Sequence, residues 1–142
     1  MKFTHSFSSL LLATTLFLAG CSQQISYTDY VDPKIGTGDH GHVFVGANVP
    51  WGMVNVGPVQ PYHGWDWCSG YHESGDSIVG FSHTHLSGTG CSDLGDITLM
   101  PIYGYARTAG PRADFISDIA SRYRHEHEVT EPGYYSVLLD KW

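Results

Sequence analysis

Turn-forming residues break this chain into short apolar runs, and that punctuation limits what it can fold into. The 142 residues include 17 glycines and 7 prolines. Short runs rich in β-branched and aromatic side chains, bounded by Gly, Pro, Asn and Asp, are typical of antiparallel strands. Five runs of this kind are expected to be strands: 43–45, 53–56, 78–81, 97–100 and 134–139. The sequence therefore predicts a mostly β fold, an antiparallel β-sandwich.

One segment follows a helical period instead. Between residues 113 and 123, apolar side chains recur at the three- and four-residue spacing of one helix face. Asp114 stands where a helix start favours an acid, and Arg122 stands where a helix end favours a base. The pattern predicts one short helix near 114–124.

The N-terminus has the pattern of a targeting segment. A positive charge at Lys2 precedes a short apolar stretch from Leu10 to Ala19. A membrane-spanning helix needs about 20 apolar residues, so residues 1–20 are expected to be a signal peptide.

The end of that segment, Leu18-Ala19-Gly20-Cys21, resembles the lipobox of bacterial lipoproteins. In that interpretation Cys21 is lipidated and becomes the mature N-terminus, and residues 21–26 form a tether. The alternative is an ordinary secretory signal with an incidental cysteine. The expected location is the bacterial cell envelope, as an outer-membrane lipoprotein that is periplasmic or surface-exposed.

The charge balance argues against nucleic acid as a partner. Seven basic and 14 acidic side chains give a formal net charge of −7 at pH 7. Proteins that bind nucleic acid need a basic face to neutralise phosphates.

Two cysteines remain if Cys21 carries lipid, namely Cys68 and Cys91. An even number in an oxidising compartment permits a disulfide. The sequence does not place their Cα atoms within bridging distance, so a disulfide and two free thiols both stay open.

Three His-x-His pairs are candidate metal ligands: His40/His42, His83/His85 and His125/His127. Residues i and i+2 of a strand point to the same face. Each pair could therefore bind one metal ion, with Asp39, Asp66 or Glu126 as the third ligand of a zinc-type site. The alternative, which we favour, is that these histidines hydrogen-bond the backbone in tight glycine loops.

The aromatic segment 62–67 has the composition of a sugar-binding loop. Sugar rings present C–H patches that stack on aromatic faces, and their hydroxyls need polar partners. Trp65 and Trp67 flank Asp66 and offer both kinds of contact. Strand-like alternation would place both indoles on one face. A core position for one of the two tryptophans is the alternative.

A second polar loop runs from Gly80 to Gly90, with Asp93 and Asp96 shortly after it. Its polar side chains stand densely between glycines, and such groups need partners when they are buried. The two aspartates could bind a cation or a sugar hydroxyl. The glycines lack the spacing of a dinucleotide site, and the chain has no G-x-S-x-G motif.

The carboxylates do not form a recognisable catalytic pair. A glycosidase needs an acid and a base on either side of the scissile bond. The candidates are Asp39, Asp66, Glu73, Asp76, Asp93 and Asp96. None stands in a context that separates acid from base. The residues predict sugar binding rather than sugar cleavage, with no catalytic residue in this chain.

Six motifs follow one another in a fixed order: Tyr30–Gly38, Gly41–Phe44, Gly64–Tyr71, Gly80–Gly90, Asp93–Asp96 and Pro132–Val137. Together they resemble the N-terminal domain of glycoside hydrolase family 92. The resemblance implies an exo-acting, inverting, calcium-dependent α-mannosidase. It also implies a β-sandwich packed on an (α/α)6 barrel, with the catalytic acid and base supplied by the barrel.

The resemblance further implies which loops contact mannose. The residues in the first rank are His40, Gly41, His42, Phe44, Trp65, Asp66 and Trp67, and those in the second rank are His83, His85 and Asp93. Calcium is the expected cofactor, with most of its ligands outside this chain. No metal ligand is assigned within it.

The chain ends at Trp142, directly after the last expected strand. We therefore expect a signal peptide (1–20), a tether (21–26) and an incomplete N-terminal β-sandwich domain (27–142) whose catalytic barrel is missing. Such a chain would be inactive alone, with α-mannoside glycans, the barrel and a membrane as its partners. Two alternatives are a stand-alone surface mannoside-binding lipoprotein without catalysis and a small His-rich metal-binding protein.

Overall fold

A computed structural model describes residues 25–49, 52–104 and 112–142. The predicted signal peptide, Cys21 and the first part of the tether lie outside the described residues. Within these ranges, no helix combines the length and apolar character needed to cross a membrane.

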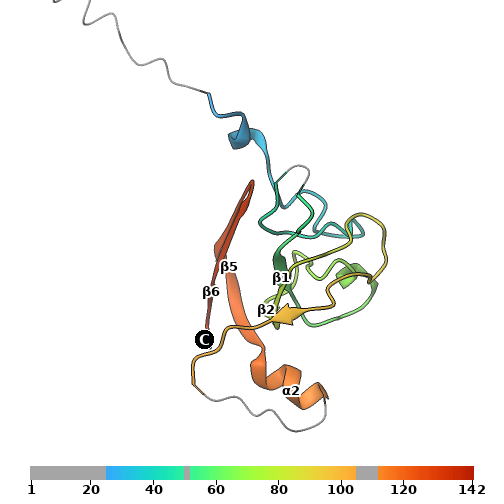
Figure 1. The fold of residues 1–142 in the computed structure, drawn as a ribbon, viewed down its shortest axis with the longest axis vertical. Helices are drawn as coiled ribbons and strands as arrows, with labels where there is room; N and C mark the ends of the chain where they lie inside the picture. Colours follow the sequence, from blue (N-terminus) through green and yellow to red (C-terminus); the bar gives the residue numbers. More distant parts are fainter. Residues whose placement is uncertain (1–24, 50–51, 105–111) are drawn as a thin grey trace, which may run out of the picture.

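Two antiparallel sheets of three strands each form the framework (Figure 1). The first has the order β1-β3-β4, with β1 at Gly57–Val59, β3 at Gly80–Ser82 and β4 at Thr98–Leu99. The second has the order β2-β5-β6, with β2 at Ser77–Ile78, β5 at Ser121–Glu131 and β6 at Tyr134–Leu139. The prediction of a mostly β, antiparallel fold is confirmed.

The expected strands agree with the structure best at the C-terminus. The run 134–139 is β6, and 97–100 contains β4. The run 78–81 divides between β2 and β3 at Val79, which donates to the Val59 carbonyl between the two strands.

Two strand predictions are wrong. The run 43–45 is not a strand, and 53–56 ends before β1 begins, with one isolated bridge between Ala47 and Val56. The two segments approach closely at Gly46, where a Cβ would overlap the carbonyl oxygen of Val56.

The predicted helix exists, but it is shifted and shorter. Helix α2 spans Arg112–Ile119, whereas the spacing predicts 114–124. Beyond it Ser121 and Tyr123 are buried and Arg122 is exposed, the period-2 pattern of a strand. Pairing with β2 and β6 overrides the local helical spacing at the start of β5.

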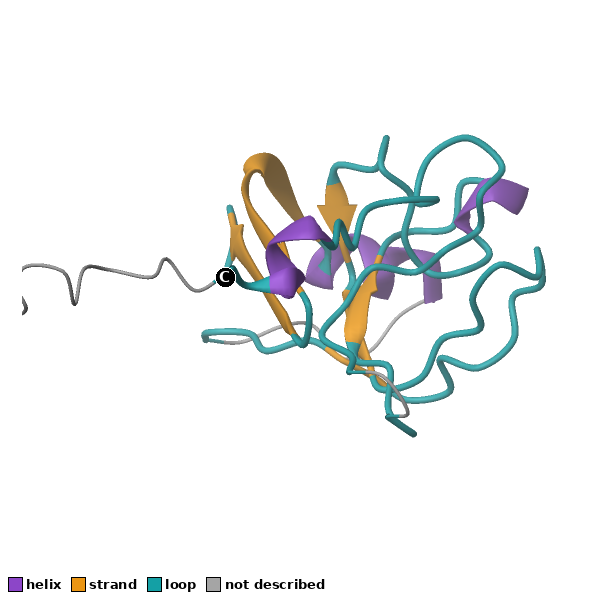
Figure 2. Ribbon diagram, turned by 90° about the horizontal axis from the view of Figure 1, so that it is seen from above, coloured by secondary structure: helices purple, strands orange, loops and turns teal. Residues whose placement is uncertain are grey.

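The core is small and mainly aromatic. Its fully buried members are Val45, Tyr71, Ile78 and Tyr123. The two sheets meet where Phe81 of β3 lies against Tyr135 of β6, with ring centroids 6.3 Å apart. Figure 2 shows the consequence for the shape: the strands gather on one side and long loops fill the other. Two 3₁₀ turns, η1 (Tyr27–Tyr30) and η2 (Trp65–Trp67), complete the fold.

Candidate functional site

Three loops that carry the predicted site residues are joined by hydrogen bonds: residues 40–44, 64–70 and 83–95. The carbonyl oxygen of His42, in the first loop, accepts from Ser69 Oγ in the second. It also accepts from the Gly88 amide in the third, at 2.6 Å. One backbone group thus fixes all three loops relative to one another.

His40, His42 and Asp66 form the first cluster within these loops. The Asp66 carboxylate lies 2.6 Å from His40 Nδ1 and 3.4 Å from His42 Nε2. The hydrogen bond to Asp66 raises the pKa of His40, and the same bond lowers the pKa of Asp66. Asp66 is therefore held as a carboxylate.

Backbone conformation brings the two imidazoles of this cluster together. Asp39 and His42 both adopt left-handed backbone angles, with φ of 47° and 52°, a conformation that few non-glycine residues take. Gly41 lies between them, and a Cβ there would overlap the carbonyl oxygen of Gly36. Gly41 is thus required by close packing of the loop.

Trp65 closes one side of the cluster. Its ring lies 4.2 Å from the His42 ring and 5.5 Å from the His40 ring, measured between centroids. Its indole N–H donates to the Gly90 carbonyl at 2.9 Å. Trp65 therefore ties the first cluster to the third loop, although the residue as a whole is 57% exposed.

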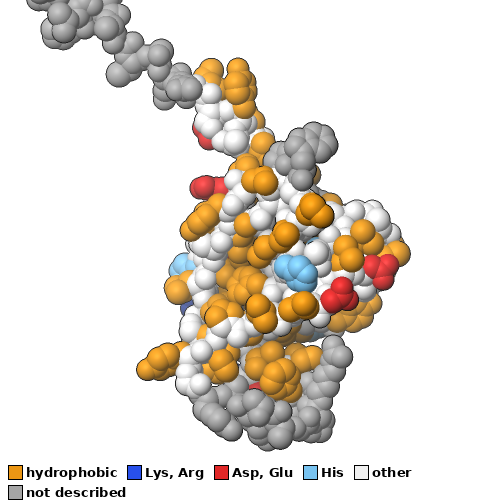
Figure 3. All heavy atoms as spheres, viewed as in Figure 1, with side chains coloured by type: hydrophobic (Ala, Val, Ile, Leu, Met, Phe, Trp, Pro, Cys, Tyr) orange, Lys and Arg blue, Asp and Glu red, His pale blue; other side chains and the backbone are white. Residues whose placement is uncertain are grey.

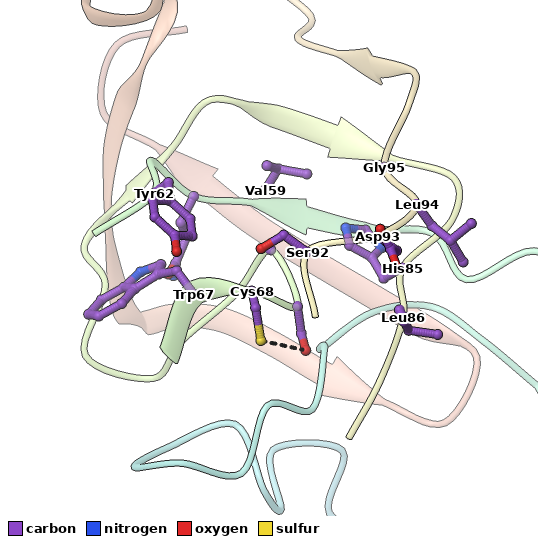
Figure 4. Close-up of a pocket in the computed structure, with 13 residues that line it drawn as sticks. Val59, Tyr62, Trp67, Cys68, His85, Leu86, Ser92, Asp93, Leu94 and Gly95 are labelled. Carbon is purple, nitrogen blue, oxygen red and sulfur yellow. Dashed lines mark hydrogen bonds between the residues drawn. The ribbon is translucent and has the colours of Figure 1, made fainter. Parts of the chain in front are cut away.

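A pocket of about 150 Å³ lies beside this cluster. Residues of the second and third loops line it, and the first loop contributes none. Its volume is on the scale of one six-membered ring. Figure 4 shows Tyr62 and Trp67 at one end and His85 with Asp93 at the other. Behind the pocket, the His85 ring stacks on Phe44, with centroids 5.5 Å apart and an interplanar angle of 7°.

Two residues that line the pocket each bury a polar atom without a partner, Trp67 Nε1 and His85 Nε2. His85 Nδ1 lies 3.0 Å from the Asn55 carbonyl oxygen, which can only accept, so Nδ1 carries the proton. Burial lowers the pKa of His85. The ring is therefore neutral and Nε2 is an acceptor. One donor, Trp67 Nε1, and one acceptor, His85 Nε2, are thus buried and unpartnered on residues that line the pocket.

The two tryptophans do not share a face. Trp65 and Asp66 belong to the first cluster, whereas Trp67 lines the pocket and packs against His72, with ring centroids 4.5 Å apart. The alternation prediction fails because this segment is the 3₁₀ turn η2, in which successive side chains are about 120° apart.

His83 lies away from both groups. It is exposed, and it lines an open apolar groove with Val56, Phe81, Ile97 and Leu99. Its neighbour His85 is buried, because the chain leaves β3 at Ser82 and the two histidines are no longer on one strand face.

The third His-x-His pair lies on β5. His125 contacts the Glu128 carboxylate at 3.0 Å and the Gly75 carbonyl at 3.0 Å. His127 lies 3.8 Å from Glu126. In the described part of the chain, only His40/His42 acquires a third potential ligand within reach.

Cys68 and Cys91, the cysteines within the described residues, are free thiols. Cys68 is buried and lines the pocket, and Cys91 is exposed. Sequence reasoning did not single out Tyr62 or Ser92 as site residues, although both line the pocket. The aromatic segment was a signal for Tyr62, whereas no motif marks Ser92.

The described residues do not offer a calcium site. Calcium prefers six to eight oxygen ligands. The one group of three potential ligands has two imidazole nitrogens and a single carboxylate. Calcium therefore does not fit these residues.

The sequence of the chain matches one family over most of its length. Residues 30–142 match the glycosyl hydrolase family 92 N-terminal domain. The chain therefore belongs to this family, whose members are glycoside hydrolases.

Solved and curated relatives agree with this assignment. A solved family GH92 α-mannosidase of Bacteroides thetaiotaomicron, seen in complex with mannoimidazole, is 40% identical with a TM-score of 0.68; the match covers 78% of this chain and 15% of that one. The GH92 glycosyl hydrolase ccman5 is 33% identical with a TM-score of 0.68, over 82% of this chain and 15% of that one. An uncharacterized secreted glycosidase of Arthroderma benhamiae is 32% identical over 112 residues, which are 78% of this chain and 14% of the relative. The chain thus spans about a seventh of the length of these relatives.

Proposed function

We propose that this chain supplies glycan-contacting loops of an exo-acting α-mannosidase that hydrolyses α-mannosides with inversion. Family membership supports glycoside hydrolysis, and the solved α-mannosidase relatives support mannose as the sugar. The observation that carries the proposal is the pocket beside η2, whose lining residues Trp67 and His85 each hold a buried polar atom without a partner.

The chemistry of the pocket suits one sugar unit. Tyr62 and Trp67 offer aromatic surface for the C–H face of a ring, and Trp67 Nε1 offers a hydrogen bond to a hydroxyl oxygen. The Asp93 carboxylate offers an acceptor, and His85 Nε2 could also accept from a hydroxyl after a small shift of the surrounding side chains, because that atom and Trp67 Nε1 are buried. A buried polar atom without a partner costs free energy, which a bound hydroxyl would recover.

The catalytic acid and base are proposed to lie outside this chain. An inverting enzyme needs a carboxylic acid that can give up a proton to the leaving group. Asp66 is unsuited to that role, because its hydrogen bond to His40 lowers its pKa and keeps it ionised. Calcium, with most of its ligands on the same catalytic barrel, belongs to this part of the proposal.

The partner that carries the acid and base is proposed to be an (α/α)6 barrel. The apolar groove formed by Val56, Phe81, Ile97 and Leu99 supports a large apolar contact, since Ile97 and Leu99 are 58% and 69% exposed. Figure 3 shows hydrophobic side chains spread over much of one face. Exposed apolar patches of this kind mark contact surfaces.

The cellular location is proposed from the N-terminal segment. A signal peptide over residues 1–20 and lipidation of Cys21 would place the protein on the bacterial outer membrane. The secreted glycosidase among its relatives supports export. Metabolic labelling with a fatty-acid analogue, lost in Cys21→Ser, would establish the anchor.

Titration of methyl α-mannoside into the purified chain by calorimetry tests the site. We expect weak binding, on the order of millimolar. Trp67→Ala should weaken it about thirtyfold, the effect of losing a contact of about 2 kcal/mol. Trp142→Ala is the matched control, because that indole N–H bonds to the Ile119 carbonyl and does not line the pocket.

Two outcomes would contradict the proposal. Equal mannoside affinity in Trp67→Ala and in the unchanged chain would remove the pocket as the sugar site. Release of mannose from p-nitrophenyl α-mannoside by this chain alone would show that the acid and base lie within it. Binding without hydrolysis is the expected result.

A further inference from the structure

Three side chains beside Trp65 direct their metal-ligating atoms into one small volume. His40 Nδ1, His42 Nε2 and Asp66 Oδ1 all lie within 4.8 Å of one another. Two of the three come from the 40–44 loop and the third from η2, so the site depends on how the loops pack. No other group of this kind occurs in the ranges that the structure describes.

His42 provides the observation that points to a ligand. Its side chain is 5% exposed, and Nε2 makes no hydrogen bond. Asp66 Oδ1 lies 3.4 Å away, outside hydrogen-bond geometry. Buried polar atoms are nearly always partnered, and an unpartnered one requires an explanation. A cation on Nε2 would provide the missing partner.

The ring of His42 is fixed where it is. Its own carbonyl oxygen is held by the Gly88 amide and the Ser69 hydroxyl. The Trp65 ring packs on the imidazole at 4.2 Å between centroids. His40, by contrast, is 74% exposed and can adjust its position. His42 is therefore already positioned as a ligand, whereas His40 can move to complete the site.

We propose that His40, His42 and Asp66 bind a zinc-type divalent cation, with water as the fourth ligand. Two imidazole nitrogens and a carboxylate oxygen are a common zinc ligand set, and the open fourth position matches sites with three protein ligands. Imidazole also suits copper and nickel. Zinc is the cation to test first because it imposes no geometry of its own.

The spacing of the ligand atoms fits this cation. In a tetrahedral zinc site the ligand atoms stand about 3.3 Å apart. The His42–Asp66 separation is 3.4 Å. The His40–Asp66 separation is 2.6 Å, a direct hydrogen bond. Metal binding would replace that hydrogen bond, with the exposed His40 ring moving outward to open the gap.

Calorimetric titration of Zn²⁺ into the purified, chelator-treated full chain tests the proposal. We expect one equivalent to bind, and Co²⁺ to give the visible absorption of a four-coordinate complex. His42→Gln and Asp66→Asn should each weaken Zn²⁺ binding by at least about tenfold. Asp66→Asn keeps the side-chain size at a partly exposed position, so this variant should fold. It therefore still tests the proposal if His42→Gln does not fold.

Two control variants separate this site from adventitious binding. His127→Gln removes an exposed histidine beside Glu126 and should leave the affinity unchanged. Cys91→Ser removes the exposed thiol and should also leave it unchanged. The proposal is overturned if no stoichiometric binding occurs, if Asp66→Asn binds Zn²⁺ as well as the unchanged chain, or if either control abolishes binding.

The zinc inference stands apart from the mannosidase proposal. Zn²⁺ binding is measured without sugar, and mannoside binding is measured in the presence of chelator. Loss of mannoside binding in Trp67→Ala therefore does not bear on the cation, and loss of Zn²⁺ binding in Asp66→Asn does not bear on the pocket. Each proposal can therefore be contradicted by its own measurement without affecting the other.

Discussion

Buried polar groups have hydrogen-bond partners in one region of the molecule and lack them in another. In the hairpin region, formed by β5, β6 and the residues that contact Glu128, one buried carboxylate is fully partnered. In the loop region, formed by residues 40–44, 64–70 and 83–95, three buried atoms lack partners: His42 Nε2, Trp67 Nε1 and His85 Nε2. These are the only such side-chain atoms among the described residues.

Glu128 shows how complete the partnering is in the hairpin region. Its side chain is fully buried and accepts hydrogen bonds from Lys34 at 2.7 Å, Tyr71 at 3.1 Å and Tyr135 at 2.7 Å. His125 contacts it at 3.0 Å. Burial raises the pKa of both Tyr71 and Tyr135, so these phenols keep their protons and remain donors.

This difference distinguishes buried polar groups that stabilise the fold from buried polar groups that are available to a ligand. A satisfied buried network rigidifies a fold and specifies one arrangement. Unsatisfied buried groups reduce stability until something binds them. The hairpin region should therefore lose stability when a polar group is removed, and the loop region should lose binding instead.

The largest effect should follow Glu128→Ala. Removing this carboxylate leaves the Lys34 ammonium and the Tyr71 and Tyr135 hydroxyls without their acceptor. Breaking a buried ionic network from one side costs about 3 kcal/mol of unfolding free energy. Urea denaturation followed by tyrosine and tryptophan fluorescence measures the loss.

Glu126→Ala is the matched control for that substitution. Glu126 lies on the same strand, but its side chain is 66% exposed and contacts only the exposed Arg124 and His127. Its removal should change the unfolding free energy by less than about 0.5 kcal/mol. Equal losses in the two variants would contradict the distinction between the regions.

A smaller effect should appear as acid destabilisation. Burial alone would raise the pKa of Glu128, but hydrogen bonds from Lys34, His125 and Tyr135 outweigh it and lower the pKa below its ordinary 4.5. A carboxyl group with a depressed folded-state pKa contributes stability that is complete above its unfolded-state pKa. That contribution should be lost as the pH falls from about 4.5 through the folded-state pKa.

Glu128→Gln isolates this contribution from those of other carboxylates. Unfolding free energies measured between pH 7 and pH 3 should decline less steeply in the variant than in the unchanged chain. Asp66 and Asp76 also have lowered pKa values and titrate in both proteins. Identical slopes would show that the Glu128 network does not control acid stability.

The smallest effect on stability is expected in the loop region, for Trp67→Phe. This change removes a buried N–H that has no partner and keeps an aromatic ring. The unfolding free energy should change by less than about 1 kcal/mol, while methyl α-mannoside affinity falls. A loss of stability close to that of Glu128→Ala would show that the loop region is structural after all.

Several residues of the candidate site lie in compact sequence motifs, and for that reason the sequence brought them forward as candidates. His42 and Asp66 belong to the first cluster, and Trp67, His85 and Asp93 line the pocket. His83 is the exception, and it lies in the apolar groove. Its position depends on where β3 ends, and the alternation pattern does not reveal that point.

The sequence does not reveal that Glu128 is the centre of a buried hydrogen-bond network. Nothing in its local context distinguishes it from the neighbouring acids of β5, and its partners are drawn from distant positions, with Lys34 94 residues away. The end of α2 is a similar case. Pairing of β5 with β2 and β6, rather than the local apolar spacing, decides that the helix stops at Ile119.

The sequence by itself determined the family, the mostly β class and the loops that carry the polar and aromatic residues. These follow from ordered motifs and local periodicity, which are properties of neighbouring residues. Only the tertiary structure decided which histidines meet a carboxylate. His40 and Asp66 are 26 residues apart, and their contact depends on left-handed backbone at Asp39 and His42 and on close loop packing. Such long-range geometry leaves no periodic trace in a sequence.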